Sequence, residues 1–213
     1  MTLTRVDRRT GERVGGRARR TPPTERRRQL LDIAEELLAE GGSDALRMDA
    51  VARAAGVTRP VVYDHFGDRD GLVVALLERH YGRIAAHVAA SVVPGQTFEE
   101  ELRAATVAYL EVARHHGRAM RSLVSAEHLS PAIEAARRRT WGAAAVRWAE
   151  RYRDHVELSP HDARALATAH LAALSALAGL CIDGRLGLAR ATRLHVTSTL
   201  AALDALADPA GGH

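Results

Sequence analysis

Side chains able to hydrogen-bond to a polyanion gather in the segment 47–66. Arg59, Tyr63 and His65 stand within seven residues of one another and carry guanidinium, hydroxyl and imidazole groups. In a short helix they are left to face outward, as a small polar surface. A helix with an apolar back and such a polar front can enter the major groove of DNA. The segment therefore indicates recognition of phosphates and base edges.

Two short helices joined by a tight turn would position these groups. Gly56 stands where a left-handed residue lets the chain reverse, and Val57 would place an apolar side chain between the helices. We expect the Thr58 hydroxyl to cap the second helix. Val62 and Phe66 are four residues apart, so they would share its inner face. Periodicity alone fits a plain helical hairpin of a bundle equally well.

The residue sequence of the segment 50–72 is more specific than its helical periodicity. The run Ala-Val-Ala-x-x-Ala-Gly-Val-Thr is followed by Val-Tyr-Asp-His-Phe-Gly-Asp-Arg-Asp-Gly-Leu. Over about 24–72 the chain resembles the DNA-binding signature of TetR-family regulators. The resemblance implies three N-terminal helices that bind DNA and a larger helical domain that binds a small ligand and dimerises. It implies DNA contacts by residues matched to the family's motif: Arg47, Thr58, Arg59, Pro60, Val61, Tyr63, His65 and Arg69.

These matched residues divide by role. The resemblance places Thr58, Tyr63, His65 and Arg69 at phosphates, and it places Arg59, Pro60 and Val61 at base edges. Phosphate contacts set position, whereas base contacts set sequence preference.

Three positions depart from the family pattern. Arg47 stands where a Thr is usual; it cannot cap as Thr does, but it can reach a phosphate. Pro60 replaces a common Gly and stiffens the start of its helix. Asp64 puts an anion on the helix that faces phosphates, where it would pair with an Arg, accept from a cytosine amine, or point away.

The whole chain reads as all-α, with about nine helices. Apolar residues recur at helical spacing, and glycines and prolines interrupt them. Thr24 is expected to cap the first helix and Gly41-Gly42 to end it. Asp68 can cap the fourth helix, and both Ser-Pro pairs suit an N-cap followed by proline. The expected helices are at about 25–40, 48–55, 58–66, 68–90, 97–115, 118–126, 131–155, 161–182 and 190–207. The expected domains are an arm at 1–23, a helix-turn-helix domain at 24–70 and a regulatory and dimerisation domain at 71–213.

The charge is distributed unevenly. All 30 basic Lys and Arg residues are Arg, and residues 1–28 hold ten of them against three acids. The rest of the chain is slightly acidic. The arm is either a solubilising tail or a minor-groove and backbone contact, and we favour the DNA contact because the arm directly precedes the first helix.

Several classes are disfavoured. Cys181 is the only cysteine, so neither an intrachain disulfide nor a thiolate zinc site is expected, and a cytoplasmic location follows. The histidines form no recognisable metal spacing, and no metal or cofactor is expected. The N-terminus lacks an apolar signal region. The apolar stretch 171–182 is too short for a membrane span.

Two further predictions concern the larger domain. Helices over about 97–155 would enclose a cavity for a largely apolar effector, with candidate lining residues Tyr109, His116, Met120, Trp141 and Trp148. The last two long helices would pair with those of a second copy through Leu166, His170, Leu174, Leu177, Cys181, Val196, Leu200 and Leu203. Packing within one chain is the alternative for both sets.

The function predicted from sequence is transcriptional regulation, as a ligand-responsive repressor that binds a palindromic operator on double-stranded DNA as a homodimer. One alternative is an all-α enzyme, although no nucleophile elbow, P-loop, dinucleotide fingerprint or HExxH motif is present. Another is an architectural protein that binds DNA non-specifically through its arm.

Overall fold

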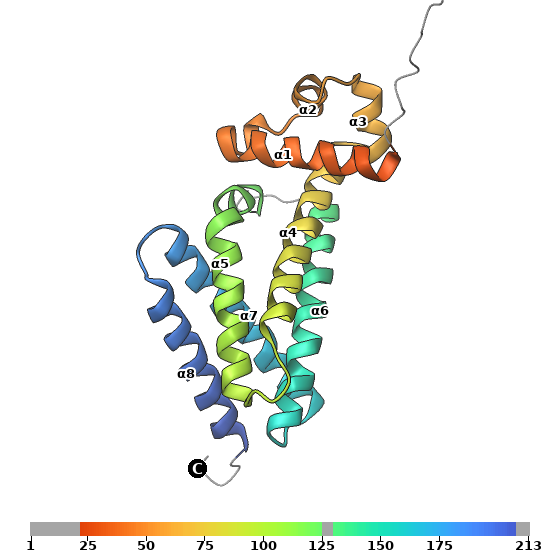
Figure 1. The fold of residues 1–213 in the computed structure, drawn as a ribbon. Coiled ribbons are helices and arrows are strands. Elements are labelled where there is room, and N and C mark those ends of the chain that lie inside the picture. The colour runs from red at the N-terminus through yellow and green to blue at the C-terminus, as the bar shows by residue number, and fades with distance from the viewer. Residues whose placement is uncertain (1–21, 125–129, 208–213) are drawn as a thin grey trace, which may run out of the picture.

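The computed structural model describes residues 22–124 and 130–207, and these residues form eight α-helices and no strand (Figure 1). This confirms the all-α prediction. The Arg-rich arm falls in 1–21, outside the described residues. The helices are α1 Pro23–Ala45, α2 Met48–Ala54, α3 Arg59–Phe66, α4 Arg69–Ser91, α5 Phe98–Val124, α6 Pro131–His155, α7 Pro160–Ile182 and α8 Leu188–Ala207.

The ninth predicted helix is absent because α5 continues where a break was expected. Gly117 lies inside α5 and does not end it. A Cβ at this glycine would come within 2.7 Å of the Ile182 Cδ1 atom. The glycine therefore serves the close approach of α5 to the end of α7.

The ends of α1 also differ from the prediction. Pro22 is the N-cap residue, so Thr24 lies inside the helix and does not cap it. At the other end the helix kinks at Gly42, whose φ of 65° is left-handed, and helical turns continue to Ala45. Gly42 thus interrupts the helix as expected, and a further short turn follows.

Serine and aspartate caps fix the starts of the later helices as predicted. Asp68 accepts a hydrogen bond from the Gly71 backbone N–H at 2.8 Å and so caps α4. Ser130 and Ser159 cap α6 and α7, and each is followed by a proline at the first helical position.

The first three helices form a small head at one end of the molecule (Figure 1). Its core joins side chains from α1, α2, α3 and the first half of α4, and most are less than 5% exposed: Leu30, Ala34, Leu38, Leu46, Val51, Ala52, Val62, Leu72, Val73 and Leu76. Met120, Leu123 and Ile133 belong to the same cluster, so the near ends of α5 and α6 pack beneath the head.

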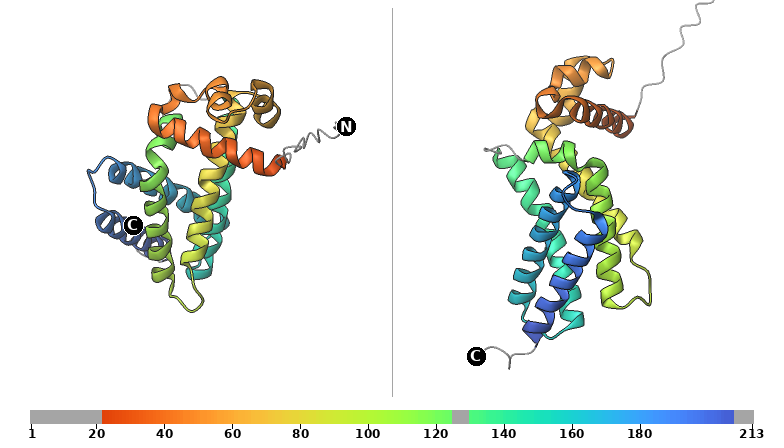
Figure 2. Two further views of the ribbon diagram at one scale, coloured as in Figure 1. Left: turned by 45° about the horizontal axis from the view of Figure 1, so that its top comes forward. Right: turned by 90° about the vertical axis from the view of Figure 1, so that its left-hand side faces the viewer.

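The body is a bundle of α4 to α8. Helix α4 packs along α5 and α6, and α6 packs along α7. Helices α7 and α8 lie side by side on one side of the bundle (Figure 2, right). Because α4 belongs to both the head core and the body, it links the two, and the near ends of α5 and α6 add further packing against the head.

Helix α7 is strongly apolar, although much of it is not buried within the protomer. By length and composition it could cross a membrane, yet only 28% of its most apolar window is buried in the protomer. One such helix is weak evidence for a membrane span, since core helices of soluble proteins pass the same test. In the part of the chain that the structure describes, much of the apolar surface of α7 is therefore left exposed.

Candidate functional sites: a helix-turn-helix and a buried cavity

The turn between α2 and α3 has the expected geometry. Gly56 adopts φ +63°, and the Val57 backbone N–H donates to the Ala52 carbonyl at 3.0 Å. Val57 is half-buried against the head core. A non-glycine residue would be strained at Gly56 because its Cβ would crowd the following carbonyl.

Helix α3 has the two faces that its sequence predicts. Val62 is fully buried and Phe66 is 8% exposed, so both anchor the helix to the head. The opposite surface carries predicted DNA-contacting residues: Thr58, Arg59, Pro60 and Tyr63 are exposed, and Val61 and His65 are half-buried. This surface is open to solvent on a rigid scaffold, which is what a groove-reading helix requires.

The expected cap at Thr58 is not formed. Thr58 occupies the N-cap position of α3, but its hydroxyl makes no capping hydrogen bond. A cap serves the backbone N–H of the second or third helical residue. Pro60 has no N–H, and the Val61 N–H already donates to the Thr58 carbonyl at 3.1 Å. The hydroxyl is thus left for another partner.

Arg69 is held by the protein itself. Its Nε donates to the Leu46 carbonyl at 3.0 Å and its Nη2 to the Ser43 carbonyl at 2.9 Å. The guanidinium therefore ties the start of α4 to the end of α1. Only its remaining N–H groups could serve a phosphate, so the predicted contact would come from a preset side chain.

Two other charged residues flank the reading surface. Arg47 is well exposed, and its Nε lies 3.9 Å from an Asp49 carboxylate oxygen. Asp64 is exposed and forms no ion pair with any arginine in the described part of the chain. Arg27 was not among the residues expected at this surface. Its guanidinium lies 4.8 Å from the centre of the Phe66 ring and so braces α3 against α1.

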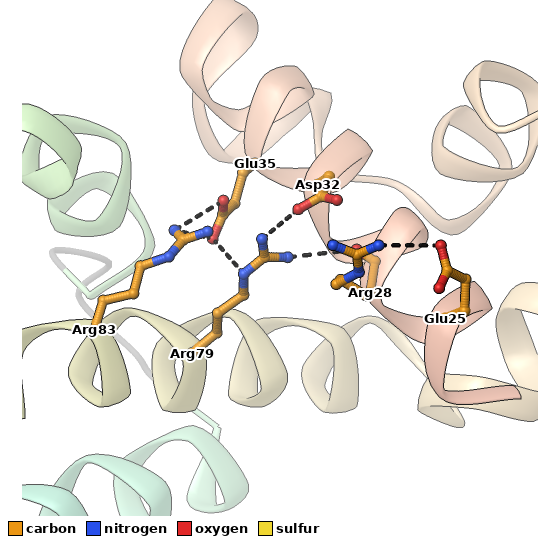
Figure 3. Close-up of polar contacts among 6 residues, drawn as sticks. All are labelled: Glu25, Arg28, Asp32, Glu35, Arg79 and Arg83. Carbon is orange, nitrogen blue, oxygen red and sulfur yellow. Dashed lines mark hydrogen bonds and ion pairs between the residues drawn. The ribbon is translucent and has the colours of Figure 1, made fainter. Parts of the chain in front are cut away.

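Ion pairs join the head to α4 (Figure 3). The Arg83 Nη1 donates to both Glu35 carboxylate oxygens, at 2.8 and 2.9 Å. Arg79 pairs with Asp32, and its Nε lies 3.5 Å from Glu35. These side chains are partly buried, so the pairs are screened less than exposed ones.

A cavity of about 310 Å³ lies in the body, between α4, α5, α6, α7 and α8. Its walls are mostly apolar and aromatic, and they include three of the predicted residues, Tyr109, Trp141 and Trp148. Met120 lies instead in the core beneath the head and does not line this cavity. The side chain of His116 is outside the described residues.

Hydrogen bonds order two parts of the cavity wall. The Trp141 Nε1 donates to the Tyr81 hydroxyl at 3.0 Å, which joins α6 to α4. At the other part the Tyr152 hydroxyl lies 3.2 Å from His170 Nδ1, and the His170 ring meets the His195 ring edge to face.

His170 and His195 are neutral at physiological pH. Burial lowers the pKa of His170. Burial, together with the proximity of His170, lowers the pKa of His195 to about 4. Burial likewise raises the pKa of Tyr109 to about 12 and raises that of Tyr152. This end of the cavity is polar but uncharged.

Most of the predicted dimer residues face the protomer's own core. His170, Leu174, Cys181, Val196 and Leu203 are at most 8% exposed, so they have little surface to offer a partner. Leu166, Leu177 and Leu200 are half-buried. The exposed faces carry smaller side chains instead: Thr168, Ala169, Ala172, Ala173 and Ala176 on α7, and Thr197, Ser198 and Ala201 on α8, next to Leu194.

These features define a helix-turn-helix head carried on a helical body with a cavity between its helices. The family model described as bacterial regulatory proteins, tetR family, matches residues 30–76. Residues 30–76, which form most of the head and the start of α4, therefore belong to this family. The match ends inside α4, which serves head and body alike, so the division of domains at residue 70 stays a prediction.

Two relatives are similar in sequence to parts of this chain. A segment of 126 residues is 33% identical to the HTH-type transcriptional activator FasR of Mycolicibacterium smegmatis and covers 57% of this chain and 58% of that protein. A segment of 73 residues is 37% identical to the HTH-type transcriptional repressor KstR of Mycobacterium tuberculosis and covers 34% of this chain and 33% of that one. The matches thus span one third to just over half of the relatives' length.

A solved structure has a similar fold over most of the chain. The tetR-family transcriptional regulator from Streptomyces coelicolor superposes with a TM-score of 0.68 at 25% identity, covering 86% of this chain and 82% of that one. The head and the helical body therefore have a common arrangement in the two proteins.

Proposed function

We propose that the protein is a DNA-binding transcriptional regulator that acts as a homodimer on a palindromic operator and responds to a small, largely apolar effector. The observation that carries the proposal is the exposed polar surface of α3, held by Val62 and Phe66 on a helix-turn-helix. In this proposal Thr58, Tyr63 and His65 contact phosphates and Arg59 reaches base edges. In this proposal the protein acts in the cytoplasm, where its DNA partner lies.

The dimer in this proposal forms through the open faces of α7 and α8. These helices lie side by side, and from Ala165 onward the exposed residues of α7 are mainly alanines, which let two helices approach closely (Figure 2). A two-fold axis there would cover the apolar surface that α7 exposes. It would also present two α3 helices to successive turns of DNA, whose half-sites lie about 34–36 Å apart.

Effector binding would reach the DNA through α4. Tyr81, Ile84 and Ala85 of this helix line the cavity, while Arg79 and Arg83 of the same turns hold α1. A shift of α4 that accommodates a ligand would therefore displace the head directly. The effector lowers DNA affinity only by as much as it prefers the shifted state.

Footprinting tests the DNA-binding proposal. The full chain is incubated at about 150 mM salt, a physiological ionic strength, with DNA that flanks its own gene. We expect one protected palindrome. Arg59→Ala should weaken binding and relax base preference at one position in each half-site, at a cost of about 1–3 kcal/mol per half-site. Tyr63→Phe should weaken binding equally on all sequences and reduce its salt dependence little, because it removes no charge.

The control variant is Arg153→Ala, which removes an exposed arginine at the far end of α6. It should bind as the unaltered protein does. Protection that ignores sequence and disappears as salt is raised would support the non-specific architectural alternative. Folded dimer that protects no site at all overturns the proposal.

A further inference from the structure

The polar end of the cavity holds a histidine with an unused hydrogen-bonding atom. His195 lines the cavity and is 4% exposed, and its Nδ1 is buried without a hydrogen-bond partner. The neighbouring His170 differs, because its Nδ1 is engaged by the Tyr152 hydroxyl. Buried polar atoms without partners are uncommon in folded proteins, so the unpartnered Nδ1 constrains the protonation of His195.

The enclosure of Nδ1 fixes where the proton lies. A neutral imidazole carries one proton, so one nitrogen donates and the other accepts. A buried N–H without an acceptor is rarer than a buried acceptor without a donor. We therefore assign the lone pair of His195 to Nδ1 and its proton to Nε2. In the described part of the chain Nε2 is not among the buried unpartnered atoms and no hydrogen bond is formed by it, so it keeps some accessible surface, which we place on the cavity that His195 lines.

We infer that the effector is an uncharged, mainly apolar molecule whose hydroxyl or carbonyl oxygen accepts a hydrogen bond from His195. This rests on the proposed function of the cavity as the effector site. Trp141, Trp148 and Leu174 would enclose the apolar part. The oxygen would meet the Nε2–H at the far end, beside Tyr152 and His170.

A carboxylate fits this end poorly. His170 and His195 are neutral, and the arginine among the lining residues, Arg147, is exposed. A buried carboxylate without a cation or several donors pays a large desolvation penalty. A neutral oxygen needs only one donor, which His195 supplies.

Binding of matched probes tests the inference. Two sets of probes are used, and the members of each set share one apolar body. The first set is decanol, decanone and decanoate, and the second is decalol, decalone and decalin carboxylate. The chain has two tryptophans, and both line the cavity, so their fluorescence reports binding directly. In at least one set we expect the alcohol or the ketone to bind at least about tenfold more tightly than the carboxylate, which is the size of one good hydrogen bond. The alcohol and the ketone then distinguish hydroxyl from carbonyl effectors.

Two variants locate the contact. His195→Leu should lower about tenfold the ratio of the affinity for the neutral probe to that for the carboxylate. His195→Gln keeps a donor and should retain part of this preference. Thr199→Val is the matched control: Thr199 lies one turn further along α8 and is also buried with an unpartnered hydroxyl, but it does not line the cavity. It should leave the preference intact.

The outcomes separate this inference from the proposed function. Tighter binding of the carboxylates, no binding by any neutral probe, or a preference that survives His195→Leu each overturns the inference. DNA affinity is measured separately by fluorescence anisotropy on the footprinted site. Sequence-selective DNA binding without a His195-dependent preference leaves the proposed function standing, whereas the preference without DNA binding leaves only the cavity assignment.

Discussion

The Trp141 indole N–H donates to the Tyr81 hydroxyl at 3.0 Å, and Tyr81 lies on α4 between Arg79 and Arg83. One short stretch of helix thus touches the cavity on one side and α1 on the other. Because ligand and head share this stretch, no long chain of contacts is needed to couple them. The ion pairs of the two arginines are the part of the link that can be removed without disturbing the cavity (Figure 3).

Replacing both arginines should loosen the head. In Arg79→Gln/Arg83→Gln, the pairs to Asp32 and Glu35 are lost, and we expect local opening of α1 to become easier by about 1 kcal/mol, or about fivefold faster amide exchange. Hydrogen exchange by mass spectrometry on peptides of α1 measures this. Arg28→Gln is the control, since Arg28 pairs with Glu25 on the same helix. Unchanged exchange in the double variant would show that the pairs do not hold the head.

Three glycines should respond differently to alanine. Gly56→Ala should destabilise by about 1–2 kcal/mol because of its left-handed φ. Gly71→Ala should cost at least as much, because a Cβ there collides with the Phe66 carbonyl oxygen. Gly82→Ala should stabilise by about 0.5–1 kcal/mol, since Gly82 is exposed inside α4 with nothing near its Cβ position.

Urea denaturation gives these free energies of unfolding. Gly82→Ala serves as the internal control for the substitution itself, because it adds the same methyl group to an unstrained helix. Equal effects at all three positions would contradict the assigned turn and close approach.

Stability should fall as the solution is acidified from about pH 6.5 to 4. The pKa of His195 is about 4 in the folded protein and about 6.5 in an unfolded chain, so the unfolded chain takes up the proton first. Folding therefore loses roughly 1 kcal/mol per pH unit from this group across that window. His170, whose pKa is also lowered, adds a loss of the same sign.

Unfolding at pH 7 and pH 5 in His195→Gln checks the assignment. The difference in free energy of unfolding between the two pH values should shrink relative to the unaltered protein. His161→Gln, at an exposed site at the start of α7, should leave the difference unchanged. The same pH dependence in all three proteins would show that His195 does not titrate as described.

A charge on the open face of α7 should separate the dimer. At a two-fold interface each substitution meets its own copy or lies near it, so Ala172→Glu would bury two carboxylates. We expect the mass to fall from dimer to monomer at micromolar concentration in analytical ultracentrifugation, with helical content kept. Ala89→Glu, on an exposed part of α4, is the control. A stable Ala172→Glu dimer would place the interface elsewhere.

The sequence by itself determined the features that depend on neighbours within a few residues. Local spacing accounts for the helical period and for the two faces of α3. Local backbone geometry and hydrogen bonds account for the reversal at Gly56 and for the caps at Asp68, Ser130 and Ser159. Such interactions are readable because both partners lie in one short window.

The tertiary structure decided what depends on partners far apart in the chain. Gly117 lies against Ile182 of α7, and the carbonyls of Ser43 and Leu46 hold Arg69. Helix α1 meets Arg83 across 48 residues. Burial of His170 and Leu203 in the protomer, where a dimer contact was expected, has the same origin. Helical spacing shows that a face is apolar, but only packing shows what covers it.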